Sequence, residues 1–474
     1  APGIDHLCRQ VEGMLLTCRQ VSSAARQLGR KRVLTEIFGV TRHTNTFEDF
    51  KWLGDYNLVH GANFFVPHLT WYSAKGRRKR DYPPVWNYQQ TYWKELNPLN
   101  DYFTRVAYAL TRGKAKVDVL LLHSIESATA AHRFGVNVDT KISDMAHKVP
   151  VSIPTEDMSA ARYFDNQMRK ALDAILTAGY ECDLGDENYI EDMGRVEGDN
   201  FIVGEMSYKV VVVPPSTTWR PKTFELLKQF AENGGKLVML GEVPSEIDCE
   251  YARTQWTELL LRDNVLSLPN SIREIQEAMD RLVPATFRLK GSDGKSVPLT
   301  YVAHRVDNDH DIIFITNSDR NSTRDYVLTV SDGRDKIVTK WDPTEGTRVK
   351  IEPNRMPSGE IRLEFSLPAC GSILLTLEPD KKNTQQQSMI DETPAKTFGY
   401  IRQQAKTVPL ATELEFKRLD PNVLVLDRIS ASLDGGKTWW DEDLEHRVRR
   451  RIAEHFGTRA ALEWQPWVSL RKGV

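Results

Sequence analysis

The chain has 474 residues, which is too long for a single hydrophobic core and implies three or four domains. Hydrophobic residues make up 40% of it and charged residues 27%, a composition typical of globular proteins. The formal net charge of −2, from 63 basic and 65 acidic side chains, excludes a general attraction to nucleic acid or to anionic lipid. No apolar run reaches the roughly 20 residues that a membrane-spanning helix needs.

Residues 1–115 alternate between the patterns of strands and helices. Apolar runs predict three strands, of which one ends at Asp5-His6 and the others cover 32–38 and 63–71. Periodic segments predict helices over 17–28, 46–60 and 92–111. Strand, helix and strand, with polar and aromatic groups at the strand exits, is how a (β/α)8 barrel builds an active site.

Glu36 stands near the far end of the second of these strands. An unpaired, ionised carboxylate is costly inside a low-dielectric core, so we expect Glu36 where the strand ends. On spacing alone, an ordinary βαβ unit with Glu36 on a solvated strand end remains the alternative.

Residues 116–285 carry nearly continuous valine and leucine runs separated by helical patterns. The runs at 118–122, 209–213 and 236–240 are typical of parallel strands buried on both faces, and they predict a doubly wound α/β domain. The sequence has no GxGxxG and no Walker A motif, so nucleotide binding is not expected.

The last part of the chain changes to all-β patterns. Short strands with recurring turn signals predict a β-sandwich over residues 286–380. Residues 381–397 are polar and glutamine-rich and are interpreted as a linker, and 398–474 as the start of a further β-sandwich. The expected fold class is therefore α/β plus all-β.

Several segments of residues 2–113 resemble the last part of a bacterial glycoside hydrolase barrel. These segments are Pro2-Gly3-Ile4-Asp5-His6-Leu7, Thr35-Glu36-Ile37-Phe38-Gly39, His60-Gly61-Ala62-Asn63, His68-Leu69-Thr70-Trp71-Tyr72-Ser73 and Arg77-Arg78-Lys79-Arg80-Asp81-Tyr82-Pro83-Pro84. They are similar to segments of multidomain hydrolases related to the family 106 α-L-rhamnosidases. The layout also resembles that of the family 42 β-galactosidases, in which a catalytic glutamate ends strand seven and a Gly-Ala-Asp segment opens strand eight. Here Asn63 stands in place of that aspartate.

The resemblance implies what each part of the chain contributes. Residues 1–115 would be the C-terminal part of a (β/α)8 catalytic barrel, and 116–285 a flavodoxin-like or amidotransferase-like domain without chemistry of its own. Residues 398–474 would begin a sugar-binding type of sandwich. The implied activity is that of a glycoside hydrolase acting on plant or microbial polysaccharide glycosides, most nearly an α-L-rhamnosidase. The alternatives are a β-galactosidase-like enzyme and a non-catalytic carbohydrate-binding or scaffold protein derived from such a hydrolase.

Glycoside hydrolysis generally requires two carboxyl groups that flank the scissile bond. Glu36 is the candidate nucleophile or general base, and Asp5, at the end of the preceding strand, is the nearest candidate for the second carboxyl. In the barrels that the chain resembles, the acid usually comes from strand four, which would lie upstream of Ala1.

Four side chains have the composition of a sugar subsite: His6, His68, Trp71 and Tyr72. Aromatic rings pack on the apolar face of a pyranose, while imidazole and hydroxyl groups bond its hydroxyls. The alternative for the two aromatic residues is a place in the core.

A basic run over 75–80 includes Arg77 and Arg78. Cations next to aromatics can bind nucleic acid, but one short loop in a nearly neutral chain favours a solvated loop or a loop at the rim of the active site. If the site binds a uronic acid, the two arginines would bind its carboxylate.

No histidine pair has metal-ligand spacing, so no cofactor is expected, with calcium on scattered carboxylates as the alternative. The expected partner is a carbohydrate, with no nucleic acid and no membrane. Three strands cannot close a barrel, so we also expect a homo-oligomer or a companion chain that completes it. The start at Ala1-Pro2-Gly3 is interpreted as that of a processed or truncated product. A bacterial protein is expected, and its compartment is left open between cytoplasm and periplasm or secretion.

Overall fold

The computed structural model describes residues 1–11, 13–41, 45–71, 85–132, 159–284, 286–380, 428–441, 443–444, 448, 451–452 and 454–457. The predicted linker at 381–397 and the basic run at 75–80 lie outside these residues. In the described part of the chain, no helix is long and apolar enough to cross a membrane.

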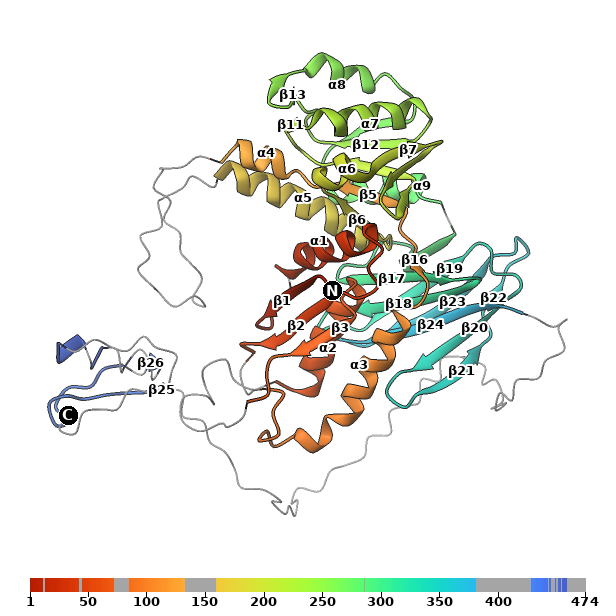
Figure 1. Cartoon of the computed structure of the whole chain (residues 1–474). Coiled ribbons are helices and arrows are strands. Elements are labelled where there is room, and N and C mark those ends of the chain that lie inside the picture. The colour runs from red at the N-terminus through yellow and green to blue at the C-terminus, as the bar shows by residue number, and fades with distance from the viewer. Residues whose placement is uncertain are drawn as a thin grey trace.

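The first residues form a parallel three-stranded sheet in the order β1-β2-β3, with helices between the strands (Figure 1). The strands and helices are β1 (Gly3–Leu7), α1 (Met14–Gln27), β2 (Leu34–Gly39), α2 (Phe47–Val59) and β3 (Phe64–Pro67). α2 begins where the sequence places it because Thr46 and Asp49 form a reciprocal capping box. β3 ends at Pro67, which is four residues short of the predicted strand end.

The helix predicted over 92–111 is shorter than expected. Residues Trp93–Glu95 form one turn of 3-10 helix, and α3 covers Asn97–Ala109. Pro98 lies in the first turn of α3, where its missing N–H costs nothing. A proline is favoured at the start of a helix, so a new helix begins here.

Five parallel strands form the second sheet, in the order β15-β12-β10-β5-β6. These strands are β5 (Val119–Leu122), β6 (Cys182–Gly185), β10 (Val210–Val213), β12 (Lys236–Leu240) and β15 (Val265–Leu268). The helices around them are α4 (Ile125–Ala130), α5 (Ser159–Thr177), α6 (Glu187–Met193), α7 (Pro221–Glu232), α8 (Arg253–Leu259) and α9 (Ile272–Leu282). Every residue of β5 and β10 is buried, as expected of strands with helices on both faces.

Two antiparallel sheets follow. One has four strands, β16 (Phe287–Gly291), β19 (Arg324–Val330), β23 (Ile361–Leu367) and β22 (Asn354–Arg355). The other has six, β21 (Thr347–Ile351), β20 (Lys336–Asp342), β24 (Ser372–Pro379), β18 (His310–Asn317), β17 (Thr300–Asp307) and β4 (Lys114–Ala115). Side chains from both sheets share one hydrophobic cluster, and β17 and β18 also contribute to the cluster that contains α2 and α3.

Several short strands were not predicted. Three of them form an antiparallel sheet beside the parallel one: β7 (Gly194–Glu197), β8 (Asn200–Val203) and β9 (Met206–Tyr208). A smaller sheet contains β11 (Thr218–Trp219), β13 (Glu246–Ile247) and β14 (Glu250–Tyr251). Near the end of the chain, β25 (Arg428–Ile429) pairs with β26 (Asp443–Leu444).

Candidate functional site

Asp5, Glu36 and His68 lie together on one face of the first sheet. Asp5 and Glu36 are direct partners in the β1–β2 ladder, so their side chains share this face. Each is the third residue of its strand, so the expectation that Glu36 stands where its strand ends is corrected: β2 continues to Gly39. His68 follows β3 directly, and its Nε2 lies 3.9 Å from Oε1 of Glu36. The Glu36 side chain is 42% exposed and that of His68 is 17% exposed, so this face is accessible.

A bulge in β2 shapes this end of the sheet. The register shifts after His6, and Phe38 occupies the extra position with φ of 71°. The ring of Phe38 is fully buried, stacked on Trp86 at 5.1 Å and edge-on to Phe50 at 4.9 Å. This packing holds a backbone conformation that a bulky residue rarely adopts.

Gly39 allows the end of β1 and the segment after β3 to approach β2 closely. A Cβ at this position would lie 3.0 Å from a methyl carbon of Leu7 and 3.5 Å from Cγ of His68. The absence of a side chain at Gly39 therefore lets the His68 ring lie close to the end of β2.

The electrostatics of the cluster distinguish Asp5 from an ordinary aspartate. Partial burial raises the pKa of the Asp5 carboxyl, the negative charge of Glu36 raises it further, and His68 lowers it. Asp5 therefore holds its proton to a higher pH than an isolated aspartate does. A carboxyl group with a raised pKa beside a second carboxyl group is an arrangement that acid–base catalysis uses.

His6, predicted as a sugar ligand, does not face this cluster. It follows Asp5 in β1, so it points to the opposite face of the sheet, where it is fully buried. Its Nδ1 accepts a hydrogen bond from the Asn57 amide at 2.7 Å, and its Nε2 donates to the carbonyl of Gln10 at 2.9 Å. Burial lowers the pKa of this imidazole. The prediction of a sugar contact for His6 is corrected, because strand alternation places it against the helices.

The remaining predicted ligands are only partly covered by the structure. Trp71 is half-buried and lies just after Thr70, whose hydroxyl donates to the carbonyl of Trp86. Tyr72, Arg77 and Arg78 lie outside the described residues.

Sequence reasoning missed Asn57, which joins β1 to β2 behind the site. Its amide contacts both His6 and Thr35, the residues next to Asp5 and Glu36. The only signal in the sequence is that Asn57 follows Phe50 and Leu53 at helical spacing, which places a polar side chain on the apolar face, and such a pattern does not reveal a partner on another strand.

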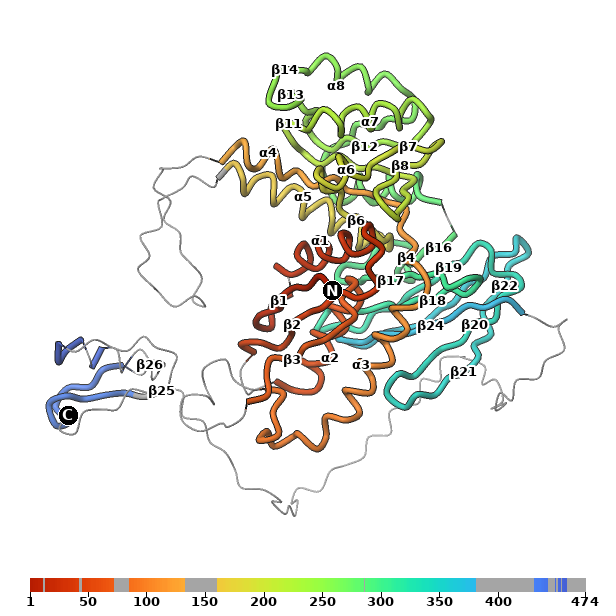
Figure 2. Tube along the Cα trace, viewed as in Figure 1, coloured from red at the N-terminus to blue at the C-terminus, as the bar shows by residue number. Residues whose placement is uncertain are grey.

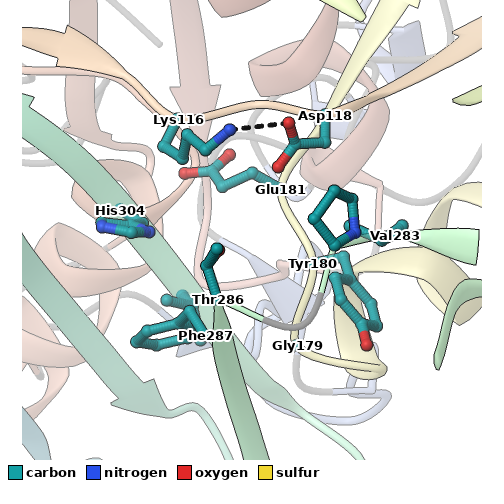
Figure 3. Close-up of a pocket in the computed structure, with 11 residues that line it drawn as sticks. Lys116, Asp118, Gly179, Tyr180, Glu181, Val283, Thr286, Phe287 and His304 are labelled. Atoms are coloured by element: carbon teal, nitrogen blue, oxygen red, sulfur yellow. Dashed lines mark hydrogen bonds and ion pairs between the residues drawn. The ribbon is translucent and has the colours of Figure 1, made fainter. Parts of the chain in front are cut away.

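A small cavity lies elsewhere, between the parallel sheet and β17 (Figure 3). Its polar lining includes Lys116, Asp118, Glu181 and His304, and the Lys116 ammonium donates to Asp118 at 2.7 Å. The volume of about 30 Å³ suits a water molecule, whereas ligand sites for small molecules usually enclose about 300 to 1,000 Å³. This cavity is therefore too small to be the sugar site.

Within the described ranges, no three His, Cys, Asp or Glu side chains are close enough to hold a metal ion. Calcium stays a prediction from the resemblance.

Comparisons with known proteins give the context of this site. No family model matches the chain. A protein of Formosa agariphila named "Putative beta-glucuronidase" is 23% identical over 338 residues, which make up 69% of this chain and 25% of that protein. A rhamnosidase structure from Novosphingobium sp. PP1Y has a TM-score of 0.56 at 17% identity, over 81% of this chain and 36% of that one.

A catalytic mutant of a family 42 β-galactosidase from G. stearothermophilus has a TM-score of 0.50 at 11% identity, over 77% of this chain and 56% of that one. The chain thus spans a quarter of the curated relative and about a third to a half of these solved structures. The resemblance expected from the sequence is confirmed: the chain is similar to part of the multidomain glycoside hydrolases, with a layout like that of the family 42 enzymes.

Proposed function

We propose that this chain carries part of the active site of a glycoside hydrolase, with Glu36 as its nucleophile or general base. The observation that supports this most directly is the pairing of Asp5 with Glu36 on neighbouring strands, with His68 beside Glu36. A protonated and an ionised carboxyl group are the two chemical parts that glycosidic bond cleavage needs.

In this proposal Glu36 attacks the anomeric carbon or activates water, and it must be ionised to do so. Asp5 holds its proton more tightly than an ordinary aspartate. It either donates that proton to the leaving oxygen or assists an acid supplied by a strand outside the described sheet. His68 orients the Glu36 carboxylate and offers a ring nitrogen to a sugar hydroxyl.

The substrate class that we propose is a glycoside of plant or microbial polysaccharide, with α-L-rhamnosides first. This order follows the resemblance and the rhamnosidase fold match. A β-galactosidase-like enzyme is the alternative. The two differ in the distance from the Glu36 carboxylate to its partner acid, which is about 5–5.5 Å in a retaining hydrolase and about 6.5–9.5 Å in an inverting one.

The architecture that we propose matches this function. β1, β2 and β3 with their helices would be the C-terminal part of a (β/α)8 barrel, the five-stranded parallel sheet an amidotransferase-like domain, and the antiparallel sheets a β-sandwich. Phe64 and Val66 are 47% and 40% exposed on the Glu36 face of the sheet, where the interior of a barrel would lie. We propose that further parallel strands cover this face and complete the site.

A second candidate is a carbohydrate-binding scaffold protein without turnover. The exposure of Glu36 favours it, because catalytic carboxylates generally act where water is largely excluded. The two candidates share the sugar site and differ only in bond cleavage.

Turnover and binding measured on the same protein separate the two. The chain is assayed with nitrophenyl α-L-rhamnoside, β-galactoside and β-glucuronide, and the corresponding free sugars are titrated by calorimetry. Turnover of any glycoside supports the hydrolase, and binding without turnover supports the scaffold. If the chain shows no binding and no turnover, both candidates are contradicted for this chain.

A further inference from the structure

Asn57, on α2, is a fully buried residue whose amide uses all of its hydrogen-bonding capacity. Its nitrogen donates to the carbonyl of Leu53 at 2.8 Å and to Nδ1 of His6 at 2.7 Å. Its oxygen accepts from the thiol of Cys18 at 3.8 Å and from the hydroxyl of Thr35 at 3.2 Å, whose single proton is shared with the carbonyl of Glu36 at 3.3 Å. One side chain thus bridges β1, β2 and α1 from the helix side of the sheet.

The partners determine which way the amide points. The carbonyl of Leu53 can only accept a hydrogen bond, so the atom that faces it must be the amide nitrogen of Asn57. That nitrogen also meets Nδ1 of His6, which must then be an unprotonated acceptor. The ring proton lies on Nε2, where it is donated to the carbonyl of Gln10. His6 is therefore neutral, with a single tautomer.

The bridged residues are the immediate neighbours of the two site carboxyls. His6 follows Asp5 in β1, and Thr35 precedes Glu36 in β2. Because both bridged residues point away from the site, Asn57 touches neither carboxyl and acts only through the two strand backbones. A displacement of either strand end would change how far apart Asp5 and Glu36 stand.

We propose that Asn57 is a positioning residue, which holds Asp5 and Glu36 in catalytic register by bridging His6 and Thr35. The proposal rests on the proposed function of the Asp5 and Glu36 pair. The bulge at Phe38 interrupts the ladder two residues after Glu36, so an additional link on the helix side keeps the two strands together.

The test compares Asn57→Ala with the matched control Asn317→Ala. Asn317 is also a buried amide, but it bonds only backbone groups, three carbonyls and the N–H of Asp319, and it lies in the antiparallel sheets. The measured quantity is the pKa of Asp5, followed by carboxyl carbon shifts in an NMR titration. With the bridge removed, Asp5 becomes less buried and lies farther from Glu36, so its pKa falls toward the ordinary value, whereas the control leaves it unchanged. A folded Asn57→Ala protein with the wild-type pKa at Asp5 overturns the proposal.

If Asn57→Ala does not fold, the wild-type protein decides. Nitrogen NMR of His6 is expected to show the neutral ring with its proton on Nε2, and a proton on Nδ1 overturns the bridge. Where the wild type cleaves a nitrophenyl glycoside, Asn57→Ala is expected to lower kcat about 100-fold with KM nearly unchanged. If the wild type cleaves none, the hydrolase proposal fails, while the Asp5 titration still tests the positioning role.

Discussion

The guanidinium of Arg19 and the carboxylate of Glu181 form an ion pair, with 0% and 3% of their side chains exposed. The pair lies where α1 packs against β6 (Figure 2). Arg26 also contacts Glu181, at 3.2 Å, and Asp183, at 2.9 Å. Burial raises the pKa of Glu181, but the two arginines outweigh this and lower it, so the carboxylate is ionised. This network links the helix that supports the candidate site to the parallel sheet.

We therefore expect Arg19→Met to destabilise the chain by about 3 kcal/mol, because removing one partner of a buried pair leaves the other charge uncompensated. Arg26 partly compensates for the loss, which places the effect at the low end of the range for buried pairs. Urea unfolding followed by circular dichroism measures the free energy. Arg273, which is 78% exposed, provides the control: Arg273→Met should unfold like wild type. Equal stability of both variants would mean that the buried pair contributes nothing.

His60 makes the stability depend on pH. Burial lowers the pKa of this imidazole well below its ordinary value, and Arg19 and Arg26 lower it further. Below pH 6.5 the folded chain therefore binds fewer protons than the unfolded chain. The free energy of unfolding falls as the pH decreases from 6.5, and His60 contributes at most about 1.4 kcal/mol per pH unit to this fall.

Unfolding titrations at pH 5 and pH 7 measure this dependence, and His60→Asn should reduce the difference between the two. The lowered pKa values of His6 and His123 leave part of it in place. The exposed His310 is the control, and His310→Asn should retain the wild-type difference. An unchanged difference in His60→Asn would refute the assignment.

Gly54 allows α2 to pack closely on α3. A Cβ at this position would lie 2.2 Å from Cε1 of Phe103, much closer than atoms approach in proteins. Gly54→Ala gains about 1 kcal/mol of helix propensity, but the forced displacement of Phe103 in a full core costs about 1–3 kcal/mol. We expect net destabilisation in thermal unfolding. Gly13→Ala meets nothing within 4 Å and should be close to neutral, and a more stable Gly54→Ala protein would show that the ring moves freely.

Glu36→Gln tests the assigned chemistry. The amide keeps the size of the side chain but can neither attack a sugar nor accept a proton, so we expect kcat to fall by several powers of ten while sugar affinity changes little. Steady-state kinetics and calorimetry measure the two effects. Glu48, exposed on α2, serves as the control, since Glu48→Gln should retain full activity. Wild-type turnover in Glu36→Gln would remove Glu36 from catalysis.

The exposed apolar face of the first sheet should make the isolated chain associate. The side chains of Phe64 and Val66 are more exposed than those of the core strands, because the described residues cover this sheet face only in part. Such exposed apolar area favours association. Light scattering of the purified protein at micromolar concentration should detect oligomers, or a complex with a companion chain that copurifies. The double variant Phe64→Ser with Val66→Thr should reduce this association. A monodisperse wild-type monomer would argue against this view of the sheet.

Local pattern in the sequence was enough to place β2, β10 and α2 near their observed positions. A buried strand needs a continuous or alternating apolar run, and α2 begins at a capping box that lies within four consecutive residues. The candidate carboxyls Asp5 and Glu36 were found in the same way, since a carboxylate in an apolar run is a local feature, but their strands continue for two and three residues beyond them. Only the tertiary structure decided that Asp5 stands opposite Glu36 while its neighbour His6 is buried against Asn57. Strand register and the bulge at Phe38 decide both, and they depend on contacts between residues about 30 to 50 positions apart, which no local periodicity encodes.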